Sequence, residues 1–552
     1  MNSTSFNICL AQLNPILGDI EYNTNKVLKI LEENKDVDLI IFPEMFLVGY
    51  PLMDHIHDPI IKKKNKEAIE KIRLFSSKAT IILGTFTESQ RIEDKLHPFY
   101  NSALIIEDKQ IKAVINKRLL PDYDVFNERR YFSFDNEFKT VKIKEYNVGI
   151  LICEDIWDEN YKTKVARKLK ENGADLLIVI NASPFHIHKF KERTELICHK
   201  AKKLSLPIIY LNMVGGLDEI VYDGKSFVTN KFGQINFIAE AFEEQVKVID
   251  AIKLINKQEV NIDYIVDWRE DVLRALKLNL YDYYHKSGIF KGVVLGLSGG
   301  IDSAFTAYVC AKALGSEKVT AIMMPTRFTS KESIEDAKNL CKNLNINYIN
   351  HPIDDLFENY QSSIENYIGK VQFDIADENL QSRIRATILM YYSNKFNWLL
   401  ISTGNKSELG VGYCTLYGDT DGGKNVPGDL FKGQIYDICD FINKQREEIP
   451  QNIIEKAPTA ELRENQKDTD SLPPYEILDK ILESIIKNGI GSDIDHLKVQ
   501  GINNQTIEKV ERLYLNSEYK RQQLVQTIKV SETAFGIGRK YPVLKRINID
   551  VK

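Results

Sequence analysis

Short apolar runs alternate with amphipathic stretches through the first half of the chain. Apolar runs of roughly four to eight residues, rich in β-branched side chains, are typical of buried strands. Helical periodicity between several of these runs predicts an α/β layered fold. The predicted strands are FNICLAQ, DLIIFPE, TIILGTF, NSALIIE, NVGILICE, DLLIVINAS and LPIIYLNM.

A second alternation begins after a polar stretch at about residues 240–268, which has no strong strand run and is interpreted as the tail of a first domain plus a linker. Strands GVVLGL, KVTAIMM, NYIN and WLLIST, separated by helical patterns, predict a doubly wound parallel sheet with ligands at the carboxyl ends of its strands. A chain of 552 residues also exceeds one usual core. We therefore predict domains at 1–255 and 269–552, joined by a linker at 256–268.

The charge and composition of the chain limit the kinds of binding partner that we expect for it. Seventy-three basic residues face seventy-eight acidic ones, so the net charge of -5 makes nucleic acid an unexpected partner. The N-terminal sequence MNSTSFNICLAQLNP lacks a signal-peptide pattern, and no segment has the length of a membrane span, so we expect a cytoplasmic protein without a membrane partner. Seven cysteines without C-x-x-C spacing indicate neither a disulfide framework nor a zinc cluster.

The sequence GLSGGIDSA joins the strand GVVLGL to a helix. Paired glycines allow close backbone approach to an anion, while serine hydroxyls and helix N-terminal amides donate hydrogen bonds to it. A tight turn with a serine cap is the alternative, but both serines and the aspartate in register favour phosphate binding. No lysine follows the glycines, unlike a Walker A loop. The residues expected to contact ATP are Gly296, Leu297, Ser298, Gly299, Gly300, Ile301, Asp302 and Ser303.

A second polar segment, STGNKSELGVGYCTLYGDTDGG, begins at the end of the strand WLLIST. It is expected at the same sheet edge as the phosphate loop. Thr403 can then reach a nucleotide, and Glu408 can share a magnesium ion with Asp302, because both are hard oxygen ligands. A solvated surface carboxylate is the alternative for Glu408 taken alone.

The S-G-G-x-D-S pattern resembles the pyrophosphate loop of the N-type ATP pyrophosphatases. Together with ENLQSRIR, STGNKSELG and SEYKR, it resembles the NAD synthetase signature within that group, over nearly all of residues 270–545. The resemblance implies ATP with Mg²⁺ and no organic prosthetic group. It also implies that Thr403 contacts ATP, that Asn379, Glu408 and Lys520 contact deamido-NAD, and that Asp302 and Glu408 hold the metal.

Three residues whose side chains suit nucleophilic catalysis lie at the ends of predicted strands in the first half of the chain, or follow them closely. They are Glu44 in LIIFPEMFLVGYP, Lys117 in INKRLLPDYDVF and Cys153 in VGILICEDIW. A carboxylate base and an ammonium neighbour can make an exposed cysteine thiol an effective nucleophile. A buried small hydrophobe is the more common role for a single cysteine, but three local motifs in this order favour catalysis.

This constellation resembles the Glu-Lys-Cys triad of the nitrilase superfamily, which implies an α-β-β-α sandwich. The resemblance implies that Glu44 accepts the thiol proton and that Cys153 attacks the glutamine carboxamide. Lys117 and the backbone amide of Glu154 then stabilise the oxyanion.

Further positions follow from the same resemblance. Glu128 matches an auxiliary glutamate that orients the lysine, although pairing with the arginines that follow it is nearly as good an interpretation. Tyr123, Ser183 and Lys189 match glutamine-binding positions, with Lys189 suited to the α-carboxylate. A solvated surface lysine is the alternative for Lys189.

The two halves together resemble the glutamine-dependent NAD synthetases. The resemblance implies glutamine hydrolysis, passage of ammonia to the second site, amidation of ATP-activated deamido-NAD, and a homo-oligomer formed through the synthetase domain. Two alternatives stay open: another amidotransferase of the ATP pyrophosphatase group, forming GMP or asparagine, and an amidase regulated by a nucleotide-sensing module. Pyrophosphate release would separate an enzyme from a sensor.

Overall fold

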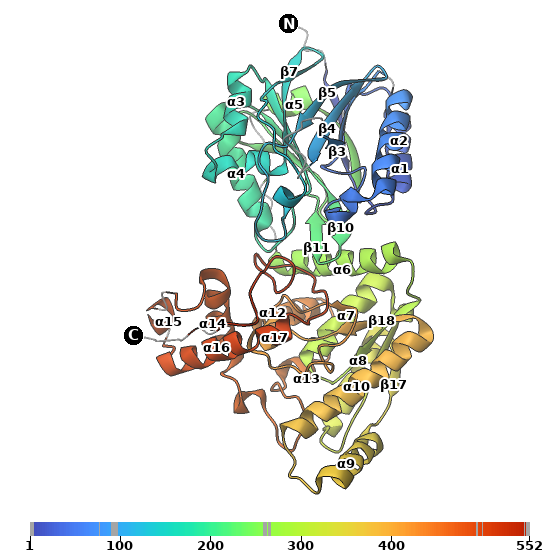
Figure 1. Cartoon of the computed structure of the whole chain (residues 1–552), viewed down its shortest axis with the longest axis vertical. Helices are drawn as coiled ribbons and strands as arrows, with labels where there is room; N and C mark the ends of the chain where they lie inside the picture. The colour runs from blue at the N-terminus through green and yellow to red at the C-terminus, as the bar shows by residue number, and fades with distance from the viewer. Residues whose placement is uncertain are drawn as a thin grey trace. The chain divides into compact units, whose positions relative to one another are not determined.

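The computed structural model describes residues 5–547 except 77, 90–97, 258–261, 263–266, 493–494, 500 and 546. Two compact units divide the chain between Asp267 and Trp268 (Figure 1). None of the helices in the described part of the chain combines the length and apolar character needed to cross a membrane.

The N-terminal unit contains two six-stranded sheets. Their orders are β14-β1-β2-β3-β4-β5 and β13-β12-β9-β8-β7-β6. Isoleucines of both sheets, including Ile8, Ile41, Ile150 and Ile178, form one buried cluster between them. The strands are β1 (Asn7–Gln12), β2 (Leu39–Ile41), β3 (Thr80–Glu88), β4 (Phe99–Glu107), β5 (Gln110–Asn116), β6 (Val141–Ile143), β7 (Tyr146–Ile152), β8 (Leu176–Asn181), β9 (Ile208–Asn212), β12 (Phe227–Thr229), β13 (Ile235–Ile238) and β14 (Gln245–Asp250).

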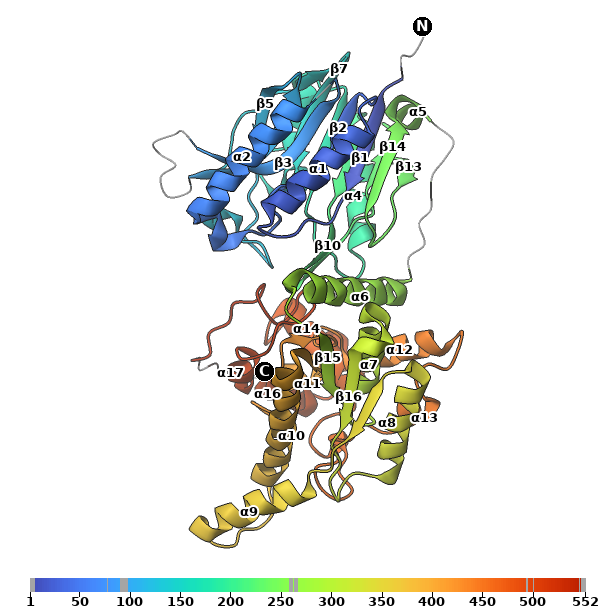
Figure 2. The same ribbon diagram turned by 90° about the vertical axis from the view of Figure 1, so that its right-hand side faces the viewer.

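Helices cover the outer faces of these sheets. The helices α1 (Ile20–Glu33) and α2 (Pro59–Phe75) pack on the first sheet, and α3 (Val165–Glu171) and α4 (Lys189–Leu204) pack on the second (Figures 1 and 2). The predicted α-β-β-α sandwich is confirmed. A separate hairpin is formed by β10 (Val214–Leu217) and β11 (Ile220–Asp223).

The polar stretch at 240–268 contains a strand that was not predicted. The strand β14 pairs antiparallel with β1 at the edge of the first sheet, and the helix α5 (Ala251–Asn256) follows it. Val246 and Val248 are exposed, so this edge strand lacks the continuous apolar run of a central strand. Of the predicted linker, 258–261 and 263–266 lie outside the described residues.

The C-terminal unit is built on a parallel sheet of order β17-β16-β15-β18-β19. From β15 the chain adds β16 and β17 on one side and then β18 and β19 on the other, so the strand order reverses between β15 and β18. Doubly wound folds bind ligands at such a point. This confirms the predicted doubly wound sheet and places both predicted loops at one edge. The strands are β15 (Gly292–Gly296), β16 (Val319–Met323), β17 (Asn347–Asn350), β18 (Trp398–Ser402) and β19 (Lys424–Asn425).

Helices lie on both faces of this sheet. The helix α10 (Ile375–Phe396) packs on β15 and β18 through a cluster that includes Ile384, Val294 and Leu400. The helices α7 (Ile301–Leu314) and α8 (Lys331–Leu344) lie on the opposite face (Figure 2). The later helices α14 (Tyr475–Asn488), α16 (Asn504–Asn516) and α17 (Glu518–Arg521) pack against α11 (Lys406–Val411), which follows β18.

Candidate active sites

Three charged side chains meet in the interior of the N-terminal unit. Glu44 follows β2 and Lys117 follows β5, while Glu128 begins the short 3-10 helix η3 (Glu128–Arg130). The Lys117 Nζ atom lies 2.8 Å from Glu44 Oε1 and 2.7 Å from Glu128 Oε1. All three side chains are buried, so these are charge-assisted bonds in a low-dielectric setting. In the structure, the Glu128 carboxylate is therefore paired with Lys117.

Neighbouring groups fix the orientation of the Glu44 carboxylate. The Asn101 side-chain amide donates to Glu44 Oε1 over 2.7 Å, and the Ala182 backbone N–H donates to Oε2 over 2.8 Å. Tyr50 donates to Glu128 over 2.8 Å. Gly84 lies against the backbone of Glu44, where an added Cβ atom would stand 2.1 Å from the Pro43 carbonyl oxygen. None of these supporting residues was predicted.

The charges of the cluster shift one another's pKa values. Burial opposes the charged form of Lys117, but Glu128 and Glu44 raise its pKa well above the ordinary value, which keeps it an ammonium. Burial raises the pKa of Glu128 to about 7, although Lys117 acts in the opposite direction. One ammonium thus stands between two carboxylates.

Cys153 directly follows β7 and begins the 3-10 turn η4 (Cys153–Ile156) with a φ of 43°. A non-glycine residue in the left-handed region is strained, a feature that concentrates at functional sites. The Asp155 carboxylate accepts hydrogen bonds from the backbone N–H groups of Ile152, Arg118 and Leu119. The turn that carries Cys153 is therefore bonded to the segment that follows Lys117.

Burial raises the pKa of Cys153 well above its ordinary value, Glu44 raises it further, and Lys117 lowers it. The resting sulfur is therefore a thiol at neutral pH. A thiol of this kind needs a base to remove its proton as it attacks. Glu44 is a fixed carboxylate that acts electrostatically on the same sulfur.

Two of the predicted glutamine-binding residues, Tyr123 and Lys189, contact this turn or the residue that ends it. Tyr123 and Tyr161 each donate to one oxygen of the buried Glu154 carboxylate, both over 2.9 Å. The Lys189 Nζ atom lies 4.1 Å from the centre of the Trp157 ring, and burial lowers its pKa. Lys189 is thus not a solvated surface lysine. Ser183 is buried just after β8.

A cavity of about 420 Å³ opens at the carboxyl edge of the sheet in the C-terminal unit. Of the residues predicted to bind ATP or deamido-NAD, Gly299 alone does not line it. Those that do are Gly296, Leu297, Ser298, Gly300, Ile301, Asp302, Ser303, Asn379, Thr403, Glu408 and Lys520.

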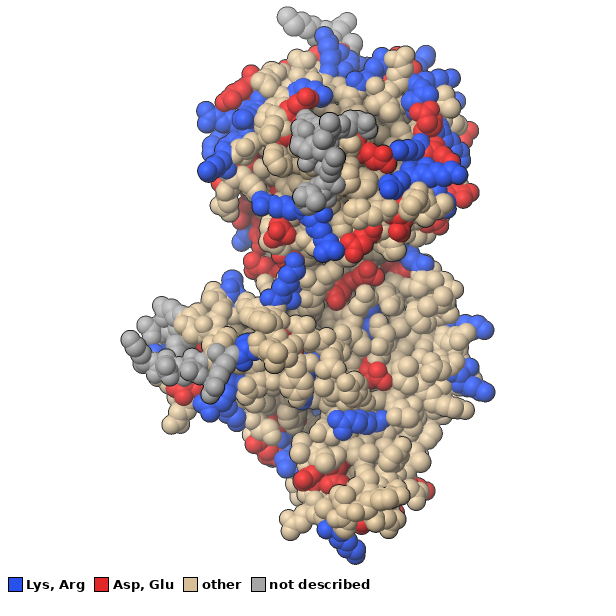
Figure 3. Space-filling model, viewed as in Figure 1, with Lys and Arg blue, Asp and Glu red and all other residues tan. Residues whose placement is uncertain are grey.

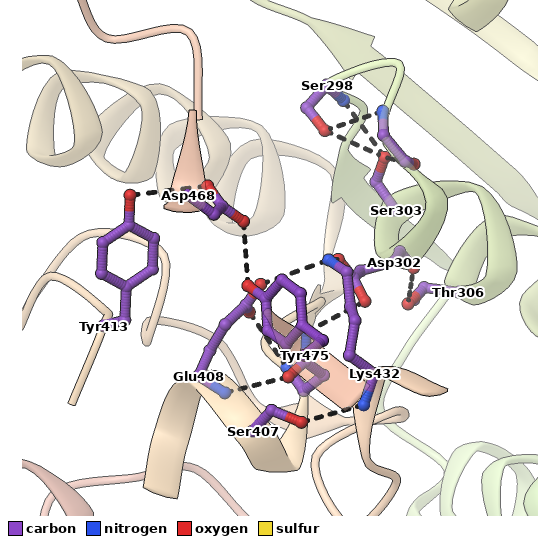
Figure 4. A network of polar contacts seen from close by, with 12 residues as sticks. Ser298, Asp302, Ser303, Thr306, Ser407, Glu408, Tyr413, Lys432, Asp468 and Tyr475 are labelled. Carbon is purple, nitrogen blue, oxygen red and sulfur yellow. Dashed lines mark hydrogen bonds and ion pairs between the residues drawn. The ribbon is translucent and has the colours of Figure 1, made fainter. Parts of the chain in front are cut away.

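The predicted phosphate loop runs from β15 into the N-terminus of α7, and its serines are bonded to one another (Figure 4). Ser303 Oγ donates to the Gly300 carbonyl over 2.9 Å, and the Gly300 N–H donates to Ser298 Oγ over 3.2 Å. Gly299 has a φ of +78°, and a Cβ atom there would stand 2.4 Å from the Ser333 carbonyl oxygen. Gly299 therefore shapes the loop from behind.

Asp302 and Glu408 converge on one cation, the ammonium of Lys432 (Figure 4). Lys432 Nζ contacts Asp302 Oδ2 and lies 3.5 Å from Glu408 Oε1. Asn405 Nδ2 donates to Asp302 Oδ1 over 3.1 Å and holds that carboxylate. Among the described residues, no group of three or more histidine, cysteine or acidic side chains could hold a metal ion.

Asn379 and Lys520, which were also predicted to bind deamido-NAD, form hydrogen bonds with the segment that follows α11. Thr415 Oγ1 donates to Asn379 Oδ1 over 2.7 Å. Lys520, on α17, donates to the carbonyl oxygens of Gly412 and Cys414 over 2.8 and 2.6 Å. Lys432 and Asp468, which also line the cavity, were missed. Neither residue lies in a recognisable loop directly after a predicted strand, so no local sequence pattern indicated a role for it.

Burial of Glu408 has a consequence for stability. Burial raises its pKa, Lys432 lowers it and Asp302 raises it further, with a result of about 8 against an ordinary 4.5. The folded state therefore holds a proton that the unfolded state loses between these values. Stability from this group is complete below about pH 4.5 and is lost as the pH rises to about 8.

We expect Glu408→Gln to remove this dependence. Between pH 5 and 8, the free energy of unfolding of the ligand-free wild type should fall relative to that of the variant, by at most about 1.4 kcal/mol per pH unit. Thermal unfolding of both proteins across this range measures the difference. A difference that stays constant with pH would show that Glu408 is ionised throughout.

Comparisons with known proteins cover both units. The carbon-nitrogen hydrolase family model matches residues 7–268, and the NAD synthase model matches residues 272–524. The chain is 39% identical to the glutamine-dependent NAD(+) synthetase of Thermotoga maritima, with 98% of each chain covered. It is 37% identical to that of Acinetobacter baylyi, again over 98% of each chain.

Solved structures agree with these matches. The glutamine-dependent NAD+ synthetase of Acinetobacter baumannii in complex with ADP has a TM-score of 0.77 and 35% identity, over 98% of each chain. The synthetase of Cytophaga hutchinsonii, at 23% identity and a TM-score of 0.84 over 98% of each chain, shares the fold.

Proposed function

This chain belongs to the family of glutamine-dependent NAD(+) synthetases, and on that basis we propose a role for each residue of its two sites. The enzyme is a carbon-nitrogen ligase that hydrolyses glutamine and amidates deamido-NAD to NAD at the expense of ATP. One observation in each unit supports the proposal. Buried Glu44, Lys117 and Cys153 act electrostatically on one another in the first unit. In the second unit, all but one of the residues predicted to bind ATP or deamido-NAD line one cavity at the sheet edge.

In the N-terminal unit, Glu44 takes the proton of the Cys153 thiol as the sulfur attacks the carboxamide carbon of glutamine. Lys117 and the Glu154 backbone N–H stabilise the oxyanion that forms, a contribution of about 3 kcal/mol per donor. Glu44 returns this proton to the departing nitrogen, and ammonia leaves. The carboxylate that is regenerated then activates a water molecule, which releases glutamate and the free thiol from the thioester. Glu128 holds Lys117 charged and in place. Tyr123, Ser183 and Lys189 bind the glutamine.

In the C-terminal unit, the carboxylate of deamido-NAD attacks the α-phosphorus of ATP, and pyrophosphate leaves against the loop that contains Ser298 and Ser303. Thr403 contacts the ATP, while Asn379, Glu408 and Lys520 bind deamido-NAD. Ammonia then displaces AMP from the acyl adenylate and forms NAD. Because free ammonia in neutral water is mostly ammonium, we propose that it passes between the sites in a protected path.

The residues present fit a magnesium ion that arrives with ATP. Mg²⁺ is usually bound by one or two carboxylates together with substrate phosphates, so the lack of a third protein ligand in the described residues is no obstacle. Asp302 and Glu408 already converge on one cation, Lys432, and they would hold the metal. It would supply charge stabilisation for the phosphates.

Pyrophosphate release tests the assignment of the substrate. The purified protein is incubated with ATP, Mg²⁺ and glutamine, with deamido-NAD, xanthylate or aspartate as the acceptor. Release of pyrophosphate and formation of NAD with deamido-NAD only is the expected result. Activity with another acceptor would change the product assigned here, and no release with any acceptor would favour a regulated amidase.

An apolar ridge on the C-terminal unit supports assembly through this unit. It comprises exposed side chains of α9 (Asp354–Ile368), the segment after it and α10. Figure 3 shows few charged side chains over the face that carries these helices. Ile375, which is 66% exposed, also lines the cavity, so a second copy on the ridge would help to close it. The ridge consists of Leu356, Tyr360, Ile364, Tyr367, Ile368, Val371, Phe373, Ile375, Tyr391 and Phe396.

Charge on the ridge should disrupt the oligomer. We expect the double variant Tyr367→Glu/Ile368→Glu to have a lower molar mass by light scattering after size-exclusion chromatography, because burying two carboxylates is costly. Val499→Glu is the control, since Val499 is equally apolar and 87% exposed outside the ridge. An unchanged mass for the ridge variant would contradict assembly through this face.

A cytoplasmic location accords with seven free cysteines and with ATP as a substrate. The partners proposed for this chain are accordingly small molecules and further copies of itself.

A further inference from the structure

A buried ion pair lies directly behind Ser183 in the amidase unit. It joins Arg193, one helical turn after Lys189 on α4, to Asp223 at the end of β11. Both side chains are 0% exposed. Arg193 Nη1 and Nη2 each lie 3.1 Å from Asp223 Oδ1. Neither residue has a part in the chemistry described above.

This pair and its neighbour Asn212 engage the backbone N–H of Ser183, its carbonyl oxygen and one acceptor position of its hydroxyl. The Ser183 N–H donates to Asn212 Oδ1 over 2.9 Å, and its carbonyl accepts from Asn212 Nδ2 over 3.3 Å. Arg193 Nη2 donates to Ser183 Oγ over 3.3 Å. Asn212 Nδ2 also donates to Asp223 Oδ1 over 3.2 Å. Asp223 therefore accepts hydrogen bonds from both Arg193 and Asn212, the two residues that bond to Ser183.

The direction of the bond to Ser183 is set by chemistry. A guanidinium can only donate, so Ser183 Oγ accepts there and keeps its own O–H for donation. The Arg193–Asp223 pair is neutral overall. It therefore acts on a ligand by orienting the Ser183 hydroxyl and not by adding a net charge to the site. A serine hydroxyl turned in this way can donate to an oxygen acceptor such as a carboxylate.

Resting on the proposed function, we propose that Arg193 is a positioning residue of the amidase site. Held by Asp223, it fixes the Ser183 hydroxyl as a hydrogen-bond donor to the α-carboxylate of glutamine, for which Lys189 on the same helix supplies the cation. Arg193 thus acts on substrate selection through Ser183. It does not touch the reacting atoms.

A double-mutant cycle tests this relation. Arg193→Lys, Ser183→Ala and the double variant are compared by kcat/KM for glutamate release from glutamine. A lysine keeps the charge but cannot reach Asp223 and Ser183 together as the guanidinium fork does. We expect each single variant to lose roughly tenfold, mainly through KM, and the double variant to lose no more than the larger single loss. Losses that multiply, or an unaffected Arg193→Lys, would overturn the proposal.

The substrate acceptor is tested with the α-methyl ester of glutamine. The wild type should prefer glutamine, and both single variants should lose most of that preference. A preference that survives in both variants would overturn the carboxylate assignment. Lys200→Met is the matched control, because Lys200 forms another buried ion pair from α4, with Asp158. This variant should not change the preference.

Two further measurements separate the possible failures. Synthesis of NAD from ammonia should be unchanged in all of these variants. If Arg193→Lys does not fold, Arg193→Gln with Asp223→Asn removes both charges and should raise KM in the same way. If the wild type releases no glutamate from glutamine, the proposed function falls and this inference falls with it. Release that needs Cys153 but is indifferent to Arg193 overturns this inference alone.

Discussion

Cys153→Ala should abolish glutamine-supported NAD synthesis and leave ammonia-supported synthesis within about twofold of the wild type. The Cys153 sulfur is the nucleophile proposed for the site of Glu44 and Lys117, and without it no thioester can form. Loss of a nucleophile of this kind lowers the rate by about 10⁴-fold or more. The NAD formed with glutamine and with ammonium chloride is measured side by side.

The comparison of nitrogen sources makes this result specific. A folding defect would lower both activities, whereas loss of the amidase alone spares the ammonia reaction. Cys198→Ala is the matched control, since Cys198 is a partly buried free cysteine of the same unit and should be dispensable. Equal loss with both nitrogen sources in Cys153→Ala would contradict two separate sites.

The elements that were predictable are those with local signals. Apolar runs marked the central strands. GLSGGIDSA marked the predicted phosphate loop, because both serines and the aspartate stand in register with the glycine pair between a strand and a helix. The edge strand β14 escaped because one of its faces is exposed. Short-range patterns are thus sufficient where an element is buried on both sides.

The residues that contact and orient the site side chains could not be predicted in the same way. Asn101 reaches Glu44 across 57 residues of sequence, and Lys432 reaches Asp302 across 130. Such contacts are set by strand order and loop path, and no spacing in the chain encodes them locally. The residues proposed to carry the chemistry stood out by motif, whereas the residues that contact and orient them became visible only in the fold.

Asp302→Ala should remove NAD synthesis with either nitrogen source and leave glutamine hydrolysis in place. Asp302 faces the cavity from the first turn of α7, where it contacts Lys432 beside Glu408. Its loss removes one of two carboxylates proposed to hold a metal, and it leaves Glu408 as the ion-pair partner of Lys432 within the described part of the chain. A fall of at least about 10³-fold in synthesis is expected from lost electrostatic stabilisation.

Asp302→Asn separates charge from shape, because it keeps the volume and loses only the carboxylate. We expect it to be nearly as inactive as Asp302→Ala, since an amide is a poor substitute for a carboxylate as a Mg²⁺ ligand. Asp437→Ala, an exposed position on the helix of Lys432 (α12, Lys432–Asn443), is the control and should retain activity. Pyrophosphate release is followed with glutamine and with ammonia. Substantial release from Asp302→Asn would show that the carboxylate charge at this position is not required for the activation of deamido-NAD.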